Sequence, residues 1–170
     1  MSSSGEPSRK RPFIEIDKPS TVLCTVVAMD YKNLFYRVCS VCERTLPDNP
    51  GSSCSHYNCT NSFNPSTSSS KRLFRVLVSI ATDTEILVVI MFDRAARVLF
   101  GCSADEFFHF AKTHPYASTT ASKALEGEIL TVTLSKPKNG NAQHLRVVSV
   151  IPMRSDFQPA IHTLRELYPP

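Results

Sequence analysis

The sequence predicts a mainly β fold, a small antiparallel barrel that carries a cysteine-rich insertion and a few short helices. Several short runs are rich in β-branched and apolar side chains, which favours strands. Four of the six cysteines fall within residues 39–59, and the helical patterns are short and come only after residue 92. The chain has 170 residues, of which 42% are hydrophobic, and this is enough for one domain with one core.

Three segments are expected along the chain. Residues 1–19 are polar and read as a disordered tail, residues 20–154 as the barrel domain, and residues 155–170 as a closing helix. The tail holds a short basic cluster, Arg9-Lys10-Arg11, which is compatible with a nuclear protein. No run approaches the length of a membrane span, so no membrane partner is expected. The net charge of +4 permits a nucleic-acid ligand without establishing one.

Six strands are expected. They lie at residues 21–29, 34–38, 73–80, 85–92, 127–135 and 144–151. The third and fourth form an antiparallel hairpin across a short polar turn. The last two form another hairpin, and Asn139-Gly140 between them is a strong turn signal. The second strand leads directly into Cys39, which places the cysteine-rich insertion between strands of the sheet.

A pair of short helices is expected between the two hairpins. Asp93 is expected to cap the first, which stops at Gly101. Ser103 and Glu106 have the spacing of a capping box for the second, which ends at His114-Pro115. A last helix, over residues 156–168, has Pro159 in its first turn. Its apolar stripe consists of Ile161, Leu164, Leu167 and Tyr168.

The insertion predicts one structural zinc ion. Its cysteines are Cys39, Cys42, Cys54 and Cys59, two pairs separated by a spacer rich in proline, glycine and serine. Zinc favours four such soft ligands in a closed site, and a loop with so few apolar residues needs a metal to hold it. Two alternatives remain open: His56 in place of Cys59, and a pair of disulfides, which need an oxidising compartment.

The remaining thiols and the zinc ligands do not predict an enzyme. Cys24 and Cys102 lie in apolar surroundings and are expected to be inert core residues. Four thiolates close the coordination sphere of a metal and leave no open position for a substrate.

The predicted order of elements is that of an OB-fold barrel with an inserted zinc ribbon, a short helix pair and a C-terminal helix. The segments FYRVCSVC, FRVLVSI with LVVIMF, ARVLFGCSADEF, and EILTVTL with HLRVVSVIPM carry a more specific likeness. They resemble the zinc-containing C-terminal DNA-binding domain of the large subunit of replication protein A. The resemblance covers about residues 20–168.

The resemblance implies a protein that binds single-stranded DNA, with a zinc ion that holds the ribbon in place. It implies the four cysteines above as ligands and Phe92 as a base-stacking aromatic, although a strand-end Phe is also common in cores. The second aromatic of the family is missing, since its place falls around Lys136 and Pro137. At that place a phosphate contact is expected instead of stacking, or the affinity for DNA is expected to be lower than in the family.

Basic residues near these strands complete the expected interface. No acid lies between Asp48 and Asp83 or between Glu128 and Asp156, and both windows carry cations. The expected nucleic-acid contacts are Phe92, Arg75, Lys136, Lys138 and Arg146. The expected function is single-strand binding in DNA replication, repair, recombination or telomere maintenance, with RNA open as a ligand.

The alternative function is an assembly subunit whose ribbon and last helix recruit partners, with DNA contact secondary. In the family, that helix joins a bundle with partner subunits. The stripe of Ile161, Leu164, Leu167 and Tyr168 is therefore expected to bind partner subunits of this kind or a second copy of the chain. Packing of the helix onto its own barrel is the other interpretation, because the stripe is short.

Overall fold

A computed structural model describes residues 18–49, 51–63, 69–137 and 143–170. Most of the predicted tail, the Asn139-Gly140 turn and Lys138 lie outside these residues. The strands are β1 (Ser20–Met29), β2 (Phe35–Cys39), β3 (Ser70–Ala81), β4 (Ile86–Phe92), β5 (Ile129–Ser135) and β6 (Leu145–Pro152). The helices are α1 (Thr60–Phe63), α2 (Asp93–Phe100), α3 (Ala104–Thr113), α4 (Ala117–Leu125) and α5 (Ala160–Leu167).

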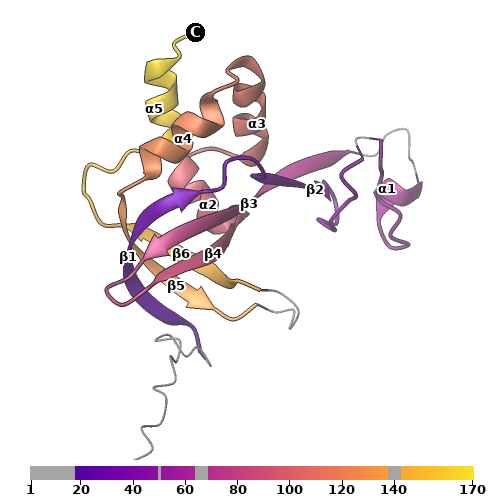
Figure 1. The fold of residues 1–170 in the computed structure, drawn as a ribbon. Coiled ribbons are helices and arrows are strands. Elements are labelled where there is room, and N and C mark those ends of the chain that lie inside the picture. The colour runs from indigo at the N-terminus through magenta and orange to yellow at the C-terminus, as the bar shows by residue number, and fades with distance from the viewer. Residues whose placement is uncertain (1–17, 50, 64–68, 138–142) are drawn as a thin grey trace, which may run out of the picture.

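Five of the strands close a barrel (Figure 1). β1 pairs antiparallel with both β3 and β5, β3 with β4, and β5 with β6. A parallel pairing between β4 and β6 completes the circle. This order of strands, with helices between β4 and β5, is the topology of an OB-fold, so the predicted fold class is confirmed.

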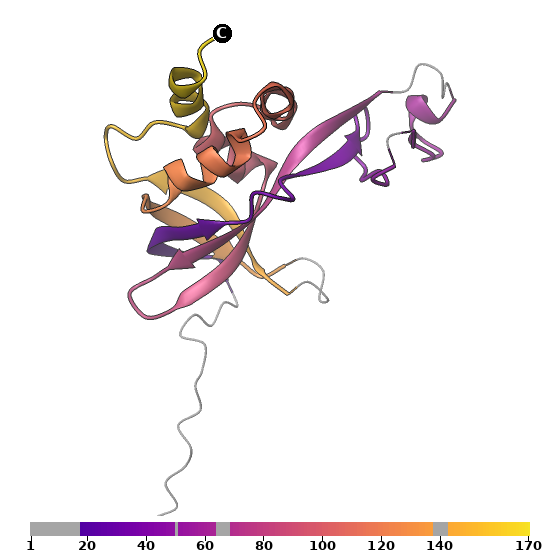
Figure 2. The same ribbon diagram turned by 45° about the horizontal axis from the view of Figure 1, so that its top comes forward.

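β3 belongs to two parts of the molecule. Its last residues pair with β1, from Val78 opposite Met29 to Ala81 opposite Thr25. Its first residues pair instead with β2, from Phe74 opposite Phe35 to Ser70 opposite Cys39. β2 and β3 therefore run together out of the barrel and carry the cysteine-rich ribbon beyond it (Figure 2). The strand is longer than predicted because its polar first residues pair on this extension, where no apolar alternation marks them.

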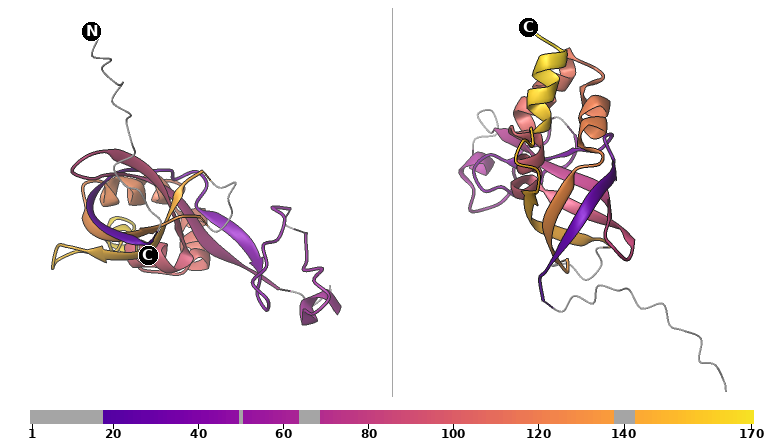
Figure 3. Two further views of the ribbon diagram at one scale, coloured as in Figure 1. Left: turned by 90° about the horizontal axis from the view of Figure 1, so that it is seen from below. Right: turned by 90° about the vertical axis from the view of Figure 1, so that its left-hand side faces the viewer.

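The core fills the barrel and the space beneath its helices, which gather at one end (Figure 3). Alternate residues of β3, among them Phe74 and Val78, are fully buried, as are Leu130 and Leu134 of β5. The ring of Phe74 stacks on Phe100 at 4.5 Å between centroids. Buried and exposed positions alternate along these strands, as is typical of a barrel whose outer face meets solvent.

The helix termini follow their local signals with two corrections, at Asp93 and at Pro159, which is the N-cap of α5 and not part of its first turn. α2 ends at Gly101, whose φ of 75° is the left-handed conformation that glycine adopts without strain. Ser103 Oγ accepts a hydrogen bond from the Glu106 N–H at 3.1 Å, as its capping role predicted. Asp93 is not the cap: Phe92 holds that position, and the Asp93 carboxylate instead accepts from the N–H of Phe74 at 3.2 Å.

The structure adds two helices that the sequence did not predict, the short α1 just after Cys59 and the longer α4. α4 buries Ala117, Ala121 and Leu125 against the barrel, and Ser122 donates to the carbonyl of Met29 at 3.3 Å. Its stretch ASTTASKAL holds four Ser or Thr residues and only one large apolar side chain. These residues are weak helix formers, so contacts with the barrel decide the conformation.

The last helix requires a correction. Ile161 and Leu164 belong to the main core and are 2% and 0% exposed. The expectation that these two side chains form a docking stripe is therefore wrong, because the protein's own core, in which α5 packs on α4 and α2, covers them. Tyr168 is half-buried, with its ring 5.0 Å from that of His114 and its hydroxyl 3.2 Å from Thr120 Oγ1. Leu167 alone of the four is exposed.

The other two thiols are core residues, as predicted. Cys24 and Cys102 are buried, and burial raises the pKa of each to about 11, which leaves them protonated and unreactive at neutral pH. Within the parts of the chain that the structure describes, no helix is long and apolar enough to cross a membrane.

Candidate functional site

The ribbon brings all four predicted ligands together. The Sγ atoms of Cys39, Cys42, Cys54 and Cys59 lie within 4.8 Å of one another. Cys39 Sγ is 3.5 Å from Cys59 Sγ, and Cys42 Sγ is 3.6 Å from Cys54 Sγ. None of the four forms a disulfide, so the alternative of two disulfides is not what the structure shows.

This geometry fits a tetrahedral metal ion. Zn–S bonds of about 2.3 Å place the sulfurs of a regular tetrahedron about 3.8 Å apart, close to the spacings in the ribbon. The backbone N–H of Val41 donates to Cys39 Sγ at 3.4 Å, an interaction that favours the thiolate. Four soft ligands, three of them buried, are the donor set that a closed structural site requires.

His56 does not join the cluster of ligand atoms. Its Nδ1 accepts from the N–H of Asn58 at 3.3 Å, and its ring lies 4.7 Å from that of Tyr57, which is 76% exposed. The first cysteine pair is closed by a tight turn in which Glu43 takes a φ of 59°. Glu43 is held there by an ion pair with Lys71 at 2.6 Å.

Arg37 fastens the spacer of the ribbon to β2 and β3. Its Nη1 donates to the carbonyls of Pro47 and Asn49 and to Ser52 Oγ, at 3.1, 2.6 and 2.8 Å. Its Nη2 donates to the carbonyl of Ser52 and to Ser70 Oγ. This role was not predicted, because the partners of Arg37 are mainly backbone carbonyls of a turn whose path cannot be read from the sequence.

The outer face of β3 and β4 presents the predicted stacking residue. Phe92 is half-buried and lies outside the core, directly opposite Arg75 in the pairing of the two strands. Arg75 is exposed. The ring of Tyr36 on β2 meets Phe92 edge-on at 6.3 Å between centroids. An aromatic pair beside an exposed guanidinium thus faces solvent where the barrel meets the ribbon.

Tyr36 was not among the predicted contacts, and its environment keeps it neutral. Burial raises the pKa of its phenol above the ordinary value, Asp93 and Glu43 raise it further, and Arg75 opposes them. The ring therefore remains an uncharged hydrogen-bond donor at physiological pH. Its sequence signal was weak, since it is an alternating strand residue three positions before a metal ligand.

Of the contacts predicted on the second hairpin, the structure brings only some to the same face as Phe92. Arg146 on β6 lies opposite Ile90 of β4 and Ser135 of β5, so it shares the outer face with Phe92, two residues along β4. Its buried Nε has no hydrogen-bond partner among the described residues. Lys136 is exposed just after β5. Lys138 lies outside the described residues.

Several cations of the two acid-free windows are already engaged. Lys71 pairs with Glu43, and Arg72 pairs with Asp105 at 3.3 Å. Arg154 makes two contacts with the buried carboxylate of Glu128. The positive surface is consequently smaller than the window counts predicted, and it centres on Arg75 and Arg146.

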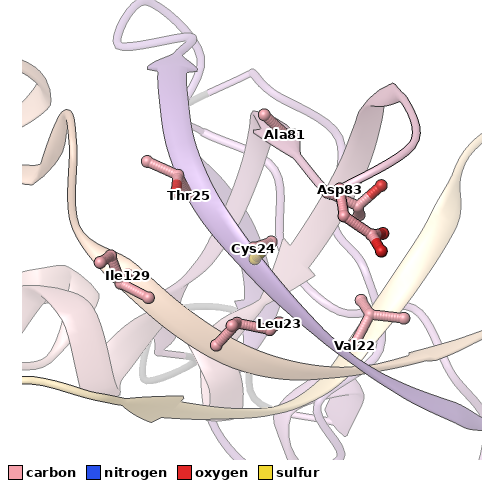
Figure 4. A pocket seen from close by; sticks show the side chains of 8 residues that line it. Val22, Leu23, Cys24, Thr25, Ala81, Asp83 and Ile129 are labelled. Atoms are coloured by element: carbon pink, nitrogen blue, oxygen red, sulfur yellow. The ribbon is translucent and has the colours of Figure 1, made fainter.

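A cleft of about 530 Å³ lies elsewhere, between β1 and the turn that follows β3 (Figure 4). Its walls are mainly aliphatic, including Val22, Leu23 and Ile129, with the carboxylate of Asp83 at its rim. No aromatic side chain or cation among the described residues lines it. It therefore lacks both elements of a single-strand interface.

Fold and site together define a class of protein: an OB-fold domain with a four-cysteine ribbon inserted between its first two barrel strands. Two solved structures share this fold. One is a chain of a replication protein A heterotrimer bound to single-stranded DNA, with a TM-score of 0.61 and 19% identity over 88% of this chain. The other is from yeast replication protein A bound to single-stranded DNA, with a TM-score of 0.62 and 14% identity over 93%.

This chain spans 35% of the first of those chains and 90% of the second. At these identities the likeness establishes the fold. No protein-family model matches the sequence, and no curated protein sequence matches it significantly.

Proposed function

We propose that this chain binds single-stranded DNA through the outer face of its barrel. The observation that carries the proposal is the cluster of Phe92, Tyr36 and Arg75 at the end of β4. Single-strand binding by OB-folds combines stacking on aromatic rings with cations along the backbone, and this face offers both. Both replication protein A structures that share the fold are bound to single-stranded DNA, which supports this choice of ligand.

The processes that use such a protein are replication, repair, recombination or telomere maintenance, and the corresponding location is the nucleus. Each stacked base contributes about 1–3 kcal/mol. One or two stacked bases and a few phosphate contacts therefore give modest affinity with a strong dependence on salt. RNA offers the same stacking surfaces and belongs in the same test.

We further propose that the metal of the ribbon is one structural zinc ion and that the chain is a binding protein, not an enzyme. Four thiolates satisfy a tetrahedral ion and leave no position for a water molecule or a substrate. The ion would act on binding only through the ribbon, whose strand β2 connects Cys39 to Tyr36 over three residues.

The test is a titration of the full chain with labelled single-stranded DNA, duplex DNA and RNA at several salt concentrations. Phe92→Ala is expected to weaken single-strand binding by roughly 1–3 kcal/mol with zinc content unchanged. Tyr116→Ala is the matched control, because Tyr116 is 73% exposed and precedes α4, away from this face. Absence of binding at low salt, or equal loss in both variants, would contradict the proposal.

One observation favours the assembly function as a second candidate. The outer face of β1, β5 and β6 exposes large apolar side chains, including Leu23 (59%), Ile151 (58%) and Met153 (53%). Thr131 lies between Leu23 and Ile151 in the register, so these side chains form one continuous surface. Such surfaces are often covered by partners. Leu23→Asp with Ile151→Asp should abolish association, seen as a change in mass by light scattering, if this face binds a partner subunit or a second copy.

A further inference from the structure

A second cleft, of about 330 Å³, opens along β2 at the base of the ribbon. Its walls come from β2, from the first residues of β3, from Phe108 of α3 and from Asp48 in the ribbon spacer. Its volume is at the lower end of the range for small-molecule pockets, which matches a single nucleotide better than a folded partner.

One wall is flat and held in place. The Arg72 guanidinium lies 3.5 Å from the centroid of the Phe108 ring, and Asp105 accepts a hydrogen bond from it at 3.3 Å. The ammonium group of Lys112 is 4.7 Å from the same centroid. Aromatic rings and guanidinium planes are the surfaces on which unpaired bases stack.

The ribbon spacer places a hydrogen-bond acceptor in the same cleft. Asp48 is exposed, and among the described residues its carboxylate makes no ion pair or hydrogen bond. The two nearest cations of the cleft are otherwise engaged: Arg37 donates to the spacer carbonyls and to Ser70, and Arg72 is paired with Asp105. Both oxygens of Asp48 are therefore available to a ligand that donates hydrogen bonds.

The cleft adjoins the proposed DNA-binding face. Tyr36 lines the cleft and its ring also contacts Phe92, whereas the neighbouring Phe35 faces the other way, toward Phe108. The cleft thus opens at the edge of β2, where the two faces of the strand meet. A strand that stacks on Phe92 can turn its next base around this edge.

We propose that this cleft binds one guanine base from the single strand that contacts Phe92. The inference rests on the proposed function and adds base preference to it. Guanine can donate both N1–H and an N2 hydrogen to the Asp48 carboxylate, whereas cytosine donates only from its N4 amino group. Thymine donates only from N3–H, so thymine and cytosine each leave one carboxylate oxygen without a partner.

The experiment uses the full chain and dT oligomers of about ten nucleotides, a length typical of one OB-fold site. A single dG is placed at each position in turn, and dC is then tested at the same positions. At one position, the oligomer with dG is expected to bind roughly tenfold more tightly than the all-dT oligomer. This is the effect expected from an additional hydrogen bond to a charged acceptor. Binding with dC should stay close to binding with dT, because each of these bases offers the carboxylate a single donor group.

Asp48→Ala is expected to abolish this preference, so that the variant binds the dG and all-dT oligomers with equal affinity. Asp83→Ala, an exposed acid at the other cleft, is the matched control and should keep the preference. Phe108→Leu, which removes the aromatic wall, should reduce the preference, and zinc content checks that each variant retains its ribbon.

Equal binding of dT, dG and dC by the wild type, or a preference that persists in Asp48→Ala, would overturn the inference. Either result leaves the proposed function intact, because Phe92→Ala would still weaken every oligomer by the same factor. A wild type that binds no single strand would overturn both.

Discussion

The barrel and the ribbon are built from the same chain but held together by different forces. The barrel and its helices bury twenty-eight described residues in one cluster, nearly all of them aliphatic or aromatic. The ribbon buries four, and three of these are cysteines of the metal site, with Leu46 as the fourth. Burial of apolar surface stabilises the first part. The second has almost no such surface to bury.

This difference shows how one chain can combine a part that folds without a ligand and a part whose structure depends on one. Hydrophobic burial needs no ligand, so the barrel is expected to fold by itself. The ribbon has the hydrogen bonds of Arg37 and four cysteines that fit a metal ion, on which we expect its structure to depend. Because β2 and β3 run from one part into the other, the metal can influence Tyr36 and Asp48 without contributing to the barrel core.

The largest effect is expected from loss of a ligand. Structural zinc sites contribute about 10–16 kcal/mol of apparent binding free energy, far more than the few apolar contacts of the ribbon. Wild type should carry about one zinc per chain, and Cys42→Ser should lose it. Cys102→Ala is the control, because this cysteine belongs to the barrel core and not to the metal cluster.

Full zinc occupancy in Cys42→Ser would show that the ribbon does not depend on four cysteines. Elemental analysis of the two purified variants, beside the wild type, gives the answer.

A smaller but still large effect is expected in α5. Leu164→Ala should destabilise the barrel by about 2–5 kcal/mol, because it removes a fully buried side chain from the core. Leu167→Ala, three residues further on and 58% exposed, should change the free energy of unfolding by less than about 0.5 kcal/mol. Chemical denaturation measures both, and similar values would mean that α5 is not part of the barrel core.

The next effect concerns the junction of α2 with the segment before α5. A Cβ at Gly101 would lie 2.3 Å from Pro159 Cβ, in addition to the strain of its φ of 75°. Gly101→Ala should therefore cost about 2–4 kcal/mol. Gly127 has a φ of 86°, but a Cβ there would meet no described atom within 4 Å, so Gly127→Ala should cost only the strain, about 1–2 kcal/mol. If thermal unfolding shows the same loss of stability in both variants, the close approach of Pro159 to Gly101 does not add to the cost of the substitution.

The sequence predicts the barrel well because its signals are local. Apolar and β-branched runs, such as those of β3 and β5, and the two cysteine pairs predict strands and a candidate metal site without any knowledge of distant residues. The helices were harder to predict. The Ser- and Thr-rich α4 has no strong pattern of its own, and the stripe of Ile161 and Leu164 is the same whether a partner or the protein's own helices cover it.

The interface was predicted only in part for a similar reason. Phe92 was predicted from the resemblance and Arg75 from the acid-free windows, and the structure places the two opposite each other on β4 and β3. Counting cations along the sequence overstated the positive surface, since the acids that neutralise Arg72 and Lys71 come from other segments, Asp105 and Glu43. Ion pairs across a fold depend on geometry that a linear pattern does not contain.

The central claim is that metal holds the ribbon and hydrophobic burial holds the barrel. Residue-resolved hydrogen exchange of the full chain, with zinc and after removal of zinc by a chelator, tests it most directly. Without metal, amides of the ribbon that are bonded in the fold, such as those of Glu43 and Cys59, should lose protection, while those within β4 and β5 stay protected. Simultaneous loss of protection in both parts, or no change in the ribbon, would contradict the claim.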